Sequence, residues 1–322
     1  MKHRSALLAA LLLSSALGAF AQGSWPTRSI TMIVPFPPGG LADLVARPVA
    51  EAMSRELGQP VGIENKGGAG GGIGMGLAAK AKPDGYTMVM ALSSLTVLPE
   101  ADVVLGRAPM FGLNDLRPVA RYTADPTVLA VRADAPWKSV QDFVDDARKR
   151  PGAINYGSSG NYGTMHVPME QLKAATSSFM LHVPYTGAGP AVLSLLSGQI
   201  EALSTGPASV KQHIASGRLR ALAHWGEGRL ASMPEVPSFK ELGVPIQYSQ
   251  WSGMFVPADT PAAVVDSLRQ AAKFAAQDPR AVAALTSAGT SFMYQDAPEF
   301  ERFVQADAKD MSALVTRIGK VD

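Results

Sequence analysis

The chain contains no cysteine among its 322 residues. This absence excludes disulfide bonds, thiolate metal ligands and a thiol that could carry a lipid. A chain of about 300 residues buries enough apolar surface to fold without such crosslinks. We therefore expect a fold that is held together by its hydrophobic core.

Long hydrophobic runs are also lacking. The apolar stretch Ala6–Leu13 is too short to cross a bilayer, which needs about 20 apolar residues. It follows the basic segment Lys2–Arg4 and precedes the small-x-small pattern Ala19–Ala21, which is typical of a cleaved signal peptide. We therefore predict a signal peptide over residues 1–21 and a mature periplasmic protein from about Gln22, with secretion into the medium as the alternative.

The chain also lacks a large excess of either basic or acidic residues. The full chain has 29 basic and 27 acidic residues, and loss of Lys2 and Arg4 with the signal peptide leaves 27 of each. Nucleic acids and anionic membranes bind proteins with a concentrated basic face. The balanced charge therefore argues against both as partners.

The sequence also lacks clear motifs for nucleotide binding, catalysis and metal binding. The glycine run Gly67–Gly76 contains no Gly-Lys-Ser or Gly-Lys-Thr and favours a structural loop. The sequence Gly157-Ser158-Ser159-Gly160 lacks the spacing of a nucleophile elbow, and the histidines after the signal peptide are not closely paired in sequence. We therefore expect no catalytic residue, no metal and no cofactor.

The most informative segment that is present runs from a predicted buried strand, residues 30–34, through Pro35–Gly40 into a helix start. Prolines fix the turn, while the two glycines let backbone N–H groups approach a ligand at a helix N-terminus, which favours anions. This geometry predicts a carboxylate site at Phe36, Pro37, Gly39, Gly40, Leu41, Ala42 and Asp43. The alternative is a plain connection in which Asp43 complements its own helix dipole.

A second polar loop between a predicted strand and a helix has the same character. Its hydroxyls, amide and glycine predict further ligand contacts at Ser158, Ser159, Gly160, Asn161 and Thr164. The alternative is a loop whose serine or threonine caps the next helix. Ligands also collect at strand ends in open α/β sheets, which adds Ser93, Ser94 and Thr205 to the candidates.

Short apolar runs alternate with amphipathic helical segments along the chain, which predicts helix-covered sheets with parallel strands. The expected strands comprise residues 30–34, 61–64, 87–91, 128–131, 154–156, 180–183, 200–203, 221–223 and 251–256. The expected helices comprise residues 42–57, 74–81, 140–149, 165–174, 188–197, 261–275, 279–287 and 298–318, the last of which should pack back on the first domain.

The chain resembles the tripartite tricarboxylate transporter substrate-binding proteins, the Bug or TctC family. The resemblance rests on Trp25-Pro26, Ile33–Gly40 with Asp43 and Arg47, Leu57–Gln59, Glu64-Asn65, Gly70–Gly74, Pro83–Thr87, Pro151-Gly152, Ser158–Gly160, His166, His182–Tyr185 with Gly187, Pro190-Ala191, Pro234–Pro237, Trp251 and Pro257 with Thr260-Pro261. The sequence departs from the family pattern at Leu98-Pro99, Tyr162-Gly163, Thr186 and Ser252.

The resemblance implies a type II periplasmic-binding fold, an α/β protein in which two lobes with mixed sheets close on a carboxylated solute. It places lobe 1 at residues 22–126 plus 249–322 and lobe 2 at 127–248, and adds Tyr185 to the ligand residues. It implies a monomer that delivers its ligand to integral membrane permease subunits. A sensory receptor that docks on a histidine kinase is the alternative, and a periplasmic enzyme on a binding-protein fold is a further one.

Overall fold

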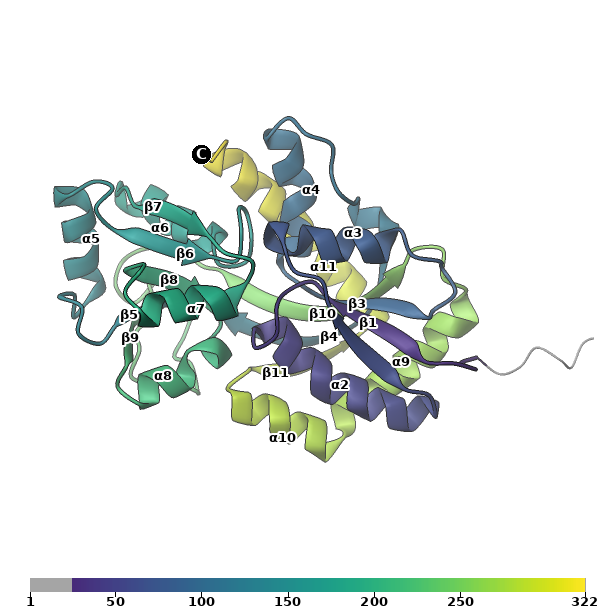
Figure 1. Cartoon of the computed structure of the whole chain (residues 1–322). Helices are drawn as coiled ribbons and strands as arrows, with labels where there is room; N and C mark the ends of the chain where they lie inside the picture. Colours follow the sequence, from purple (N-terminus) through teal and green to yellow (C-terminus); the bar gives the residue numbers. More distant parts are fainter. Residues whose placement is uncertain (1–24, 322) are drawn as a thin grey trace, which may run out of the picture.

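The computed structural model describes residues 25–321, so the predicted signal peptide lies outside the described residues. Two sheets, each covered by helices on both faces, form the two halves of the molecule (Figure 1). The strands are β1 (Ile30–Val34), β2 (Val61–Asn65), β3 (Thr87–Leu92), β4 (Leu116–Pro126), β5 (Val128–Arg132), β6 (Asn155–Ser158), β7 (Leu181–Pro184), β8 (Ala202–Thr205), β9 (Leu219–His224), β10 (Ser249–Pro257) and β11 (Phe292–Asp296). The helices are α2 (Leu41–Leu57), α3 (Gly72–Ala79), α4 (Ser94–Val104), α5 (Val140–Lys149), α6 (Val167–Thr176), α7 (Ala188–Leu196), α8 (Lys211–Ala215), α9 (Ala262–Gln277), α10 (Pro279–Ala288) and α11 (Ala297–Ile318), with single 3-10 turns η2 (Ala69–Gly71), η3 (Leu113–Asp115) and η4 (Pro207–Ser209).

The first sheet has six strands in the order β11-β4-β10-β3-β1-β2. Strand β1 pairs in parallel with β2 and β3, whereas β10 runs antiparallel to β3 and β4. Side chains of β1 and β3 alternate between the two faces because successive residues of a strand point in opposite directions. One face packs on α2 and α9, and the other on α3, α4 and α11.

The second sheet has five strands in the order β7-β6-β8-β5-β9. Strand β6 is parallel to β7 and β8, and β5 is antiparallel to β8 and β9. Helices α5 and α6 cover one face through Phe143 and Leu172, and α7 covers the other through Val192 and Leu195. Below, each sheet with its covering helices is called a lobe, the first lobe holding the six-stranded sheet.

Two crossing segments lie side by side where the lobes meet. The chain leaves the first sheet at Pro126 and enters the second at Val128, and it returns through the segment between β9 and β10. Ser249 at the start of β10 pairs with Pro126, and the Trp225 amide donates to the Thr127 carbonyl at 2.9 Å. This pairing of two short crossings is a geometry that suits hinge bending.

The α/β fold class with mixed sheets is confirmed, and α11 packs against α4 and β4 of the first lobe as the sequence predicts. Four elements were not predicted: α4, β4, α8 and β11. Strand β4 is interrupted in sequence by Arg117, Arg121 and Asp125, and helix α4 contains Pro99, so neither shows a clean hydrophobic period. No helix within residues 25–321 has the length and hydropathy that a membrane crossing requires.

Candidate ligand-binding site

A narrow cavity lies between the lobes. It contains about 270 Å³ of space between atoms, of which the centre of a water molecule can occupy about 10 Å³. The lining residues come from both lobes and from the start of β10: Phe36, Gly40, Leu41, Leu92, Ser159, Thr164, Met165, Ala188, Ser209 and Gln250. None of these ten side chains is charged, so the cavity can bind an anion only through dipoles and hydrogen-bond donors.

The first turn of α2 forms one wall of this cavity. Gly40 is the N-cap, and the Leu44 amide donates to its carbonyl at 3.0 Å, which begins the helical hydrogen-bond ladder. The amides of Leu41 and Ala42 have no hydrogen-bond partner among residues 25–321. Free first-turn amides at the positive end of a helix are a ready-made anion site.

Asp43 fixes the loop that precedes this turn. Its carboxylate accepts hydrogen bonds from the Gly39 amide at 3.1 Å, from Arg47 at 2.8 and 2.9 Å and from Asn65 at 3.1 Å. Asn65 also donates to the Phe36 carbonyl at 2.9 Å. Burial alone would raise the pKa of Asp43, but the bonds from Arg47, Gly39 and Asn65 outweigh it and lower the pKa. Asp43 therefore stays ionised and holds the loop.

The opposite wall carries hydroxyl and amide groups. Ser159 and Thr164 belong to the loop after β6, Ser209 ends the 3-10 turn after β8, and Gln250 is the second residue of β10. The Gln250 Nε2 donates to Thr164 Oγ1 at 3.2 Å. The oxygens Ser159 Oγ, Ser209 Oγ and Gln250 Oε1 are buried and have no hydrogen-bond partner among residues 25–321. Three residues that each carry an unpaired buried oxygen thus line the same small space.

The structure brings together only part of the predicted site. Of the sixteen predicted ligand residues, Phe36, Gly40, Leu41, Ser159 and Thr164 line the cavity. A separate open groove outside it contains Gly160, Asn161 and Tyr185, beside Arg107. The other eight line neither space: Pro37, Gly39, Ala42, Asp43, Ser93, Ser94, Ser158 and Thr205.

The geometry gives several of these eight residues another task. The Ala42 amide belongs to the free first turn, and Gly39 and Asp43 shape the loop. Ser93 Oγ shares a 3.0 Å hydrogen bond with the Tyr248 hydroxyl, and Ser158 Oγ is held by His182. A role for these side chains in ligand contact remains a prediction.

Ser209 and Gln250 are cavity residues that sequence reasoning missed, together with Leu92, Met165 and Ala188. Ser209 lies four residues after Thr205, the last residue of β8. The tendency of ligands to bind at strand ends, which selected Thr205, would therefore also have selected Ser209 if the search had extended four residues further. Gln250 had no such signal, because it reaches the cavity only through the return of the chain into the first sheet.

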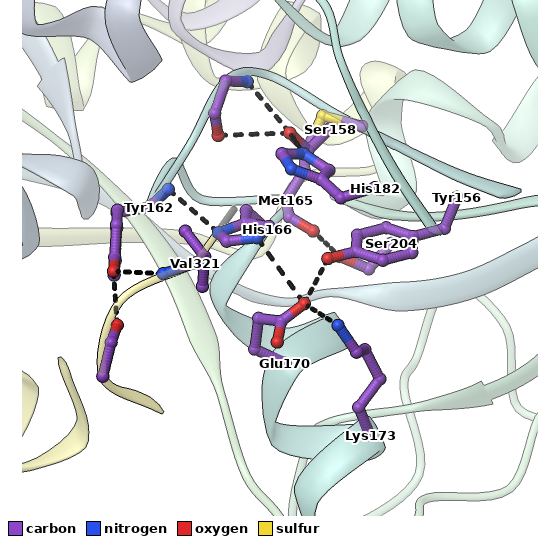
Figure 2. A network of polar contacts seen from close by, with 12 residues as sticks. Tyr156, Ser158, Tyr162, Met165, His166, Glu170, Lys173, His182, Ser204 and Val321 are labelled. Atoms are coloured by element: carbon purple, nitrogen blue, oxygen red, sulfur yellow. Dashed lines mark hydrogen bonds and ion pairs between the residues drawn. The ribbon is translucent and has the colours of Figure 1, made fainter. Parts of the chain in front are cut away.

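A buried polar network contacts the second loop, the one that follows β6, on the side away from the cavity (Figure 2). The rings of His166 and His182 lie 4.1 Å apart, and Tyr156 stacks on His182 at 5.1 Å. Tyr156 donates to Glu170, which also pairs with Lys173 at 2.7 Å. The Tyr162 amide donates to His166 Nδ1 at 2.9 Å, so the loop backbone is fixed to this network.

The same network contains a serine and histidine pair, which the sequence did not predict. Ser158 Oγ lies 2.6 Å from His182 Nε2. However, the Gly160 amide also donates to Ser158 Oγ at 3.0 Å, and Ser158 is fully buried and does not line the cavity. Burial, and then the neighbouring His166, lower the pKa of His182 to about 3, which makes it a poor general base near neutral pH. The geometry supports a structural role for this pair.

The two lobes are in close contact around the cavity. A Cβ atom placed on Gly187 of the second lobe would lie 2.5 Å from Pro37 Cδ, and one on Gly160 would lie 2.6 Å from the Gly70 amide nitrogen. The Tyr162 hydroxyl donates to the Gly319 carbonyl and accepts from the Val321 amide, which joins the second loop to the segment after α11. These contacts define a closed arrangement of the lobes.

Residues 25–321 contain no group of three or more histidine, aspartate or glutamate side chains that could hold a metal ion. The cavity itself is lined by uncharged side chains, which are poor ligands for a cation.

Two helix-covered mixed sheets with a small cavity at their junction define a periplasmic-binding-protein fold, and solved structures of that class match the chain. A family model described as the tripartite tricarboxylate transporter family receptor matches residues 45–320. The chain therefore belongs to this family, TctC, as its sequence motifs indicate.

Three solved structures illustrate the relationship. A structure described as a periplasmic transporter is 37% identical with a TM-score of 0.86, covering 91% of this chain and 98% of the other. MatC from Rhodopseudomonas palustris, solved with bound malate, is 28% identical with a TM-score of 0.82 and coverages of 90% and 100%. A further R. palustris protein, solved with adipate, is 27% identical with a TM-score of 0.85 and coverages of 91% and 98%.

Proposed function

We propose that this chain is a periplasmic receptor that binds a small carboxylate between its lobes and delivers it to a tripartite tricarboxylate-type membrane permease. The observation that carries this proposal is the cavity in which free first-turn amides of α2 face unpaired hydroxyls of the second lobe. Amides and hydroxyls are donors that neutralise a carboxylate without a cation.

The relatives support the ligand class. Two family structures contain malate and adipate, which are both short dicarboxylates. The centre of a water molecule can occupy only about 10 Å³ of the closed cavity, far less than the about 300 to 1,000 Å³ of usual ligand pockets, so the lobes must part to admit a ligand. The acids bound by these relatives make a short carboxylate the expected ligand.

The family and the predicted signal peptide support the proposed location and transport step. The predicted signal peptide over residues 1–21 and a similar structure described as a periplasmic transporter support export to the periplasm. The family description supports a permease partner. The lobe boundaries at residues 126/127 and 248/249, the closing motion and the monomeric state are parts of this proposal.

Isothermal titration calorimetry with purified mature protein tests the proposal. Among short mono-, di- and tricarboxylates, at least one should bind with a dissociation constant in the micromolar range, about −8 kcal/mol. The same acid should raise the unfolding temperature, because a ligand that binds only the folded state stabilises it. Turnover of the bound acid, or binding of cations in place of acids, would contradict the proposal.

A further inference from the structure

Gln250 lines the cavity and carries a hydrogen-bond acceptor that no group within residues 25–321 satisfies. Its side chain is 3% exposed, and its Nε2 is used by Thr164 Oγ1. Its Oε1 is buried and has no partner within residues 25–321. A buried acceptor that has lost its water costs stability unless a donor replaces that water.

Gly206 lies beside this oxygen. A Cβ atom on Gly206 would lie 3.0 Å from Gln250 Oε1 and 3.9 Å from Leu41 Cδ2. Gly206 therefore lies next to both the Gln250 side chain and the Leu41 side chain. Gln250 lines the same cavity as the first-turn residues Gly40 and Leu41, so one short ligand can contact both.

The chemistry of the three unpaired oxygens differs. Ser159 Oγ and Ser209 Oγ belong to hydroxyls, which rotate to donate or accept and so adapt to either kind of ligand group. An amide oxygen can only accept. Gln250 is therefore the cavity residue that distinguishes a donor on the ligand from an acceptor.

We propose that Gln250 selects short carboxylates that carry a hydrogen-bond donor, a hydroxyl or an amide N–H, next to the carboxylate. This inference rests on the proposed function and names the ligand class of that same cavity. An unsubstituted acid leaves Gln250 Oε1 buried and unpaired, and a keto acid places a second oxygen against it. A site built to pair with a donor rejects ligands that lack one.

Calorimetry with matched acids tests this selection. The probes are succinate, its 2-hydroxy derivative malate, its 2-keto derivative oxaloacetate and its 2-acetylamino derivative N-acetylaspartate, with the corresponding propionate and glutarate series. The wild type should bind the hydroxy or amide member of at least one series at least tenfold more tightly than the unsubstituted and keto members. In Gln250→Met, which keeps the chain length but removes the acceptor, this preference should fall below threefold.

Gln171→Met is the matched control, because Gln171 Oε1 is also buried and unpaired but lies outside the cavity. This variant should keep the wild-type preference, and circular dichroism verifies that both variants fold. Equal binding of hydroxy and unsubstituted acids by the wild type, equal binding of hydroxy and keto acids, or an unchanged preference in Gln250→Met overturns the inference and leaves the proposed function standing. Binding of no acid in any series at millimolar concentration overturns the proposed function as well.

Discussion

Glycine serves two different purposes in the first loop. Gly39 has φ of +86°, a conformation that costs other residues energy, so the backbone itself requires glycine there. Gly40 has φ of −86° and ψ of 171°, which any residue adopts. A Cβ on Gly40 would lie 3.7 Å from Ala188 Cβ, in ordinary contact with the second lobe. Position 40 therefore has room for an alanine side chain, and only side chains that extend beyond Cβ would collide with the second lobe.

This difference gives a graded prediction for ligand binding. Gly40→Val adds γ-methyl groups against Ala188 and over the free amides, and should weaken carboxylate binding at least about 100-fold, or about 3 kcal/mol. Gly40→Ala is the control and should lose less than about tenfold. Calorimetry measures both, and thermal unfolding verifies that the folds are intact. Wild-type affinity in Gly40→Val would remove the amides from the site.

Among single residues, the sequence predicts those whose role depends on their neighbours in the chain. It does not predict residues that reach the cavity only through pairing of strands far apart in sequence. The first loop could be predicted because prolines, glycines and a strand-to-helix change lie within fourteen residues of each other. Gln250 could not, because its place depends on β10 pairing with β4 and β3 across more than a hundred residues of chain. The serines were assigned by residue type, and the structure shows that Ser158 and Ser159 have different partners.

At the scale of elements, the contact of β6, β7 and α6 depends on two uncharged histidines (Figure 2). Burial lowers the pKa of His166 and of His182 to about 3, and the positive charge of Lys173 adds to this effect in both, while Glu170 partly opposes it at His182. In the unfolded chain both titrate near 6.5. The unfolded state therefore binds more protons between about pH 6.5 and 3, so stability is full above 6.5 and falls as the pH drops through this window.

Substitution of one histidine tests this pH dependence. His182→Gln keeps a nitrogen or oxygen near Ser158 but cannot be protonated. Between pH 7 and 4 its free energy of unfolding should fall by on the order of 2 kcal/mol less than that of the wild type. Urea denaturation at a series of pH values measures the slopes. His213→Gln is the control, because His213 lies on the more exposed helix α8; the pH dependence of its unfolding free energy should be nearly that of the wild type. If His182→Gln and the wild type show the same pH dependence, the His182 ring is not buried in its neutral form.

Helices and strands could be predicted where their buried residues recur at the regular spacing of a helix or a strand. Helix α2 was predicted nearly to its ends because Val45, Val49 and Met53 form one stripe. Strand β4 was not predicted because Arg121 and Asp125 are buried in it, although charged residues usually indicate an exposed segment. Burial raises the pKa of Asp125 to about 6, which shows how strongly the surrounding fold overrides the local pattern.

At the scale of the whole molecule, closure depends on glycines that meet the opposite lobe. Gly187 has φ of 172°, an extended conformation open to any residue, and the nearest atoms to its Cβ position belong to Pro37 of the first lobe. Gly187→Ala should therefore fold normally but oppose the closed arrangement. We expect at least about tenfold weaker ligand binding and a larger radius of gyration with ligand in small-angle scattering.

Gly228→Ala is the control for this closure test, because nothing lies within 4 Å of its Cβ position. It should match the wild type in both affinity and shape. If Gly187→Ala closes and binds like the wild type, the contact between Gly187 and Pro37 does not limit closure.

The segment after α11 is a second contact between the lobes. Tyr162→Phe removes the hydroxyl that bonds to Gly319 and Val321 and should speed hydrogen exchange in residues 316–321 several-fold. Tyr294→Phe is the matched control, because the Tyr294 hydroxyl is buried without a partner among residues 25–321. Unchanged exchange in Tyr162→Phe would show that this contact does not hold the segment.

The uncharged lining of the cavity has a consequence for the environment in which the receptor works. Dissolved ions screen full charges far more than they screen short contacts with dipoles inside a closed protein. An anion held by main-chain amides and hydroxyls should therefore be captured at nearly the same concentration in dilute and in saline surroundings. A cell whose medium alternates between fresh and brackish water would keep a constant threshold for this solute.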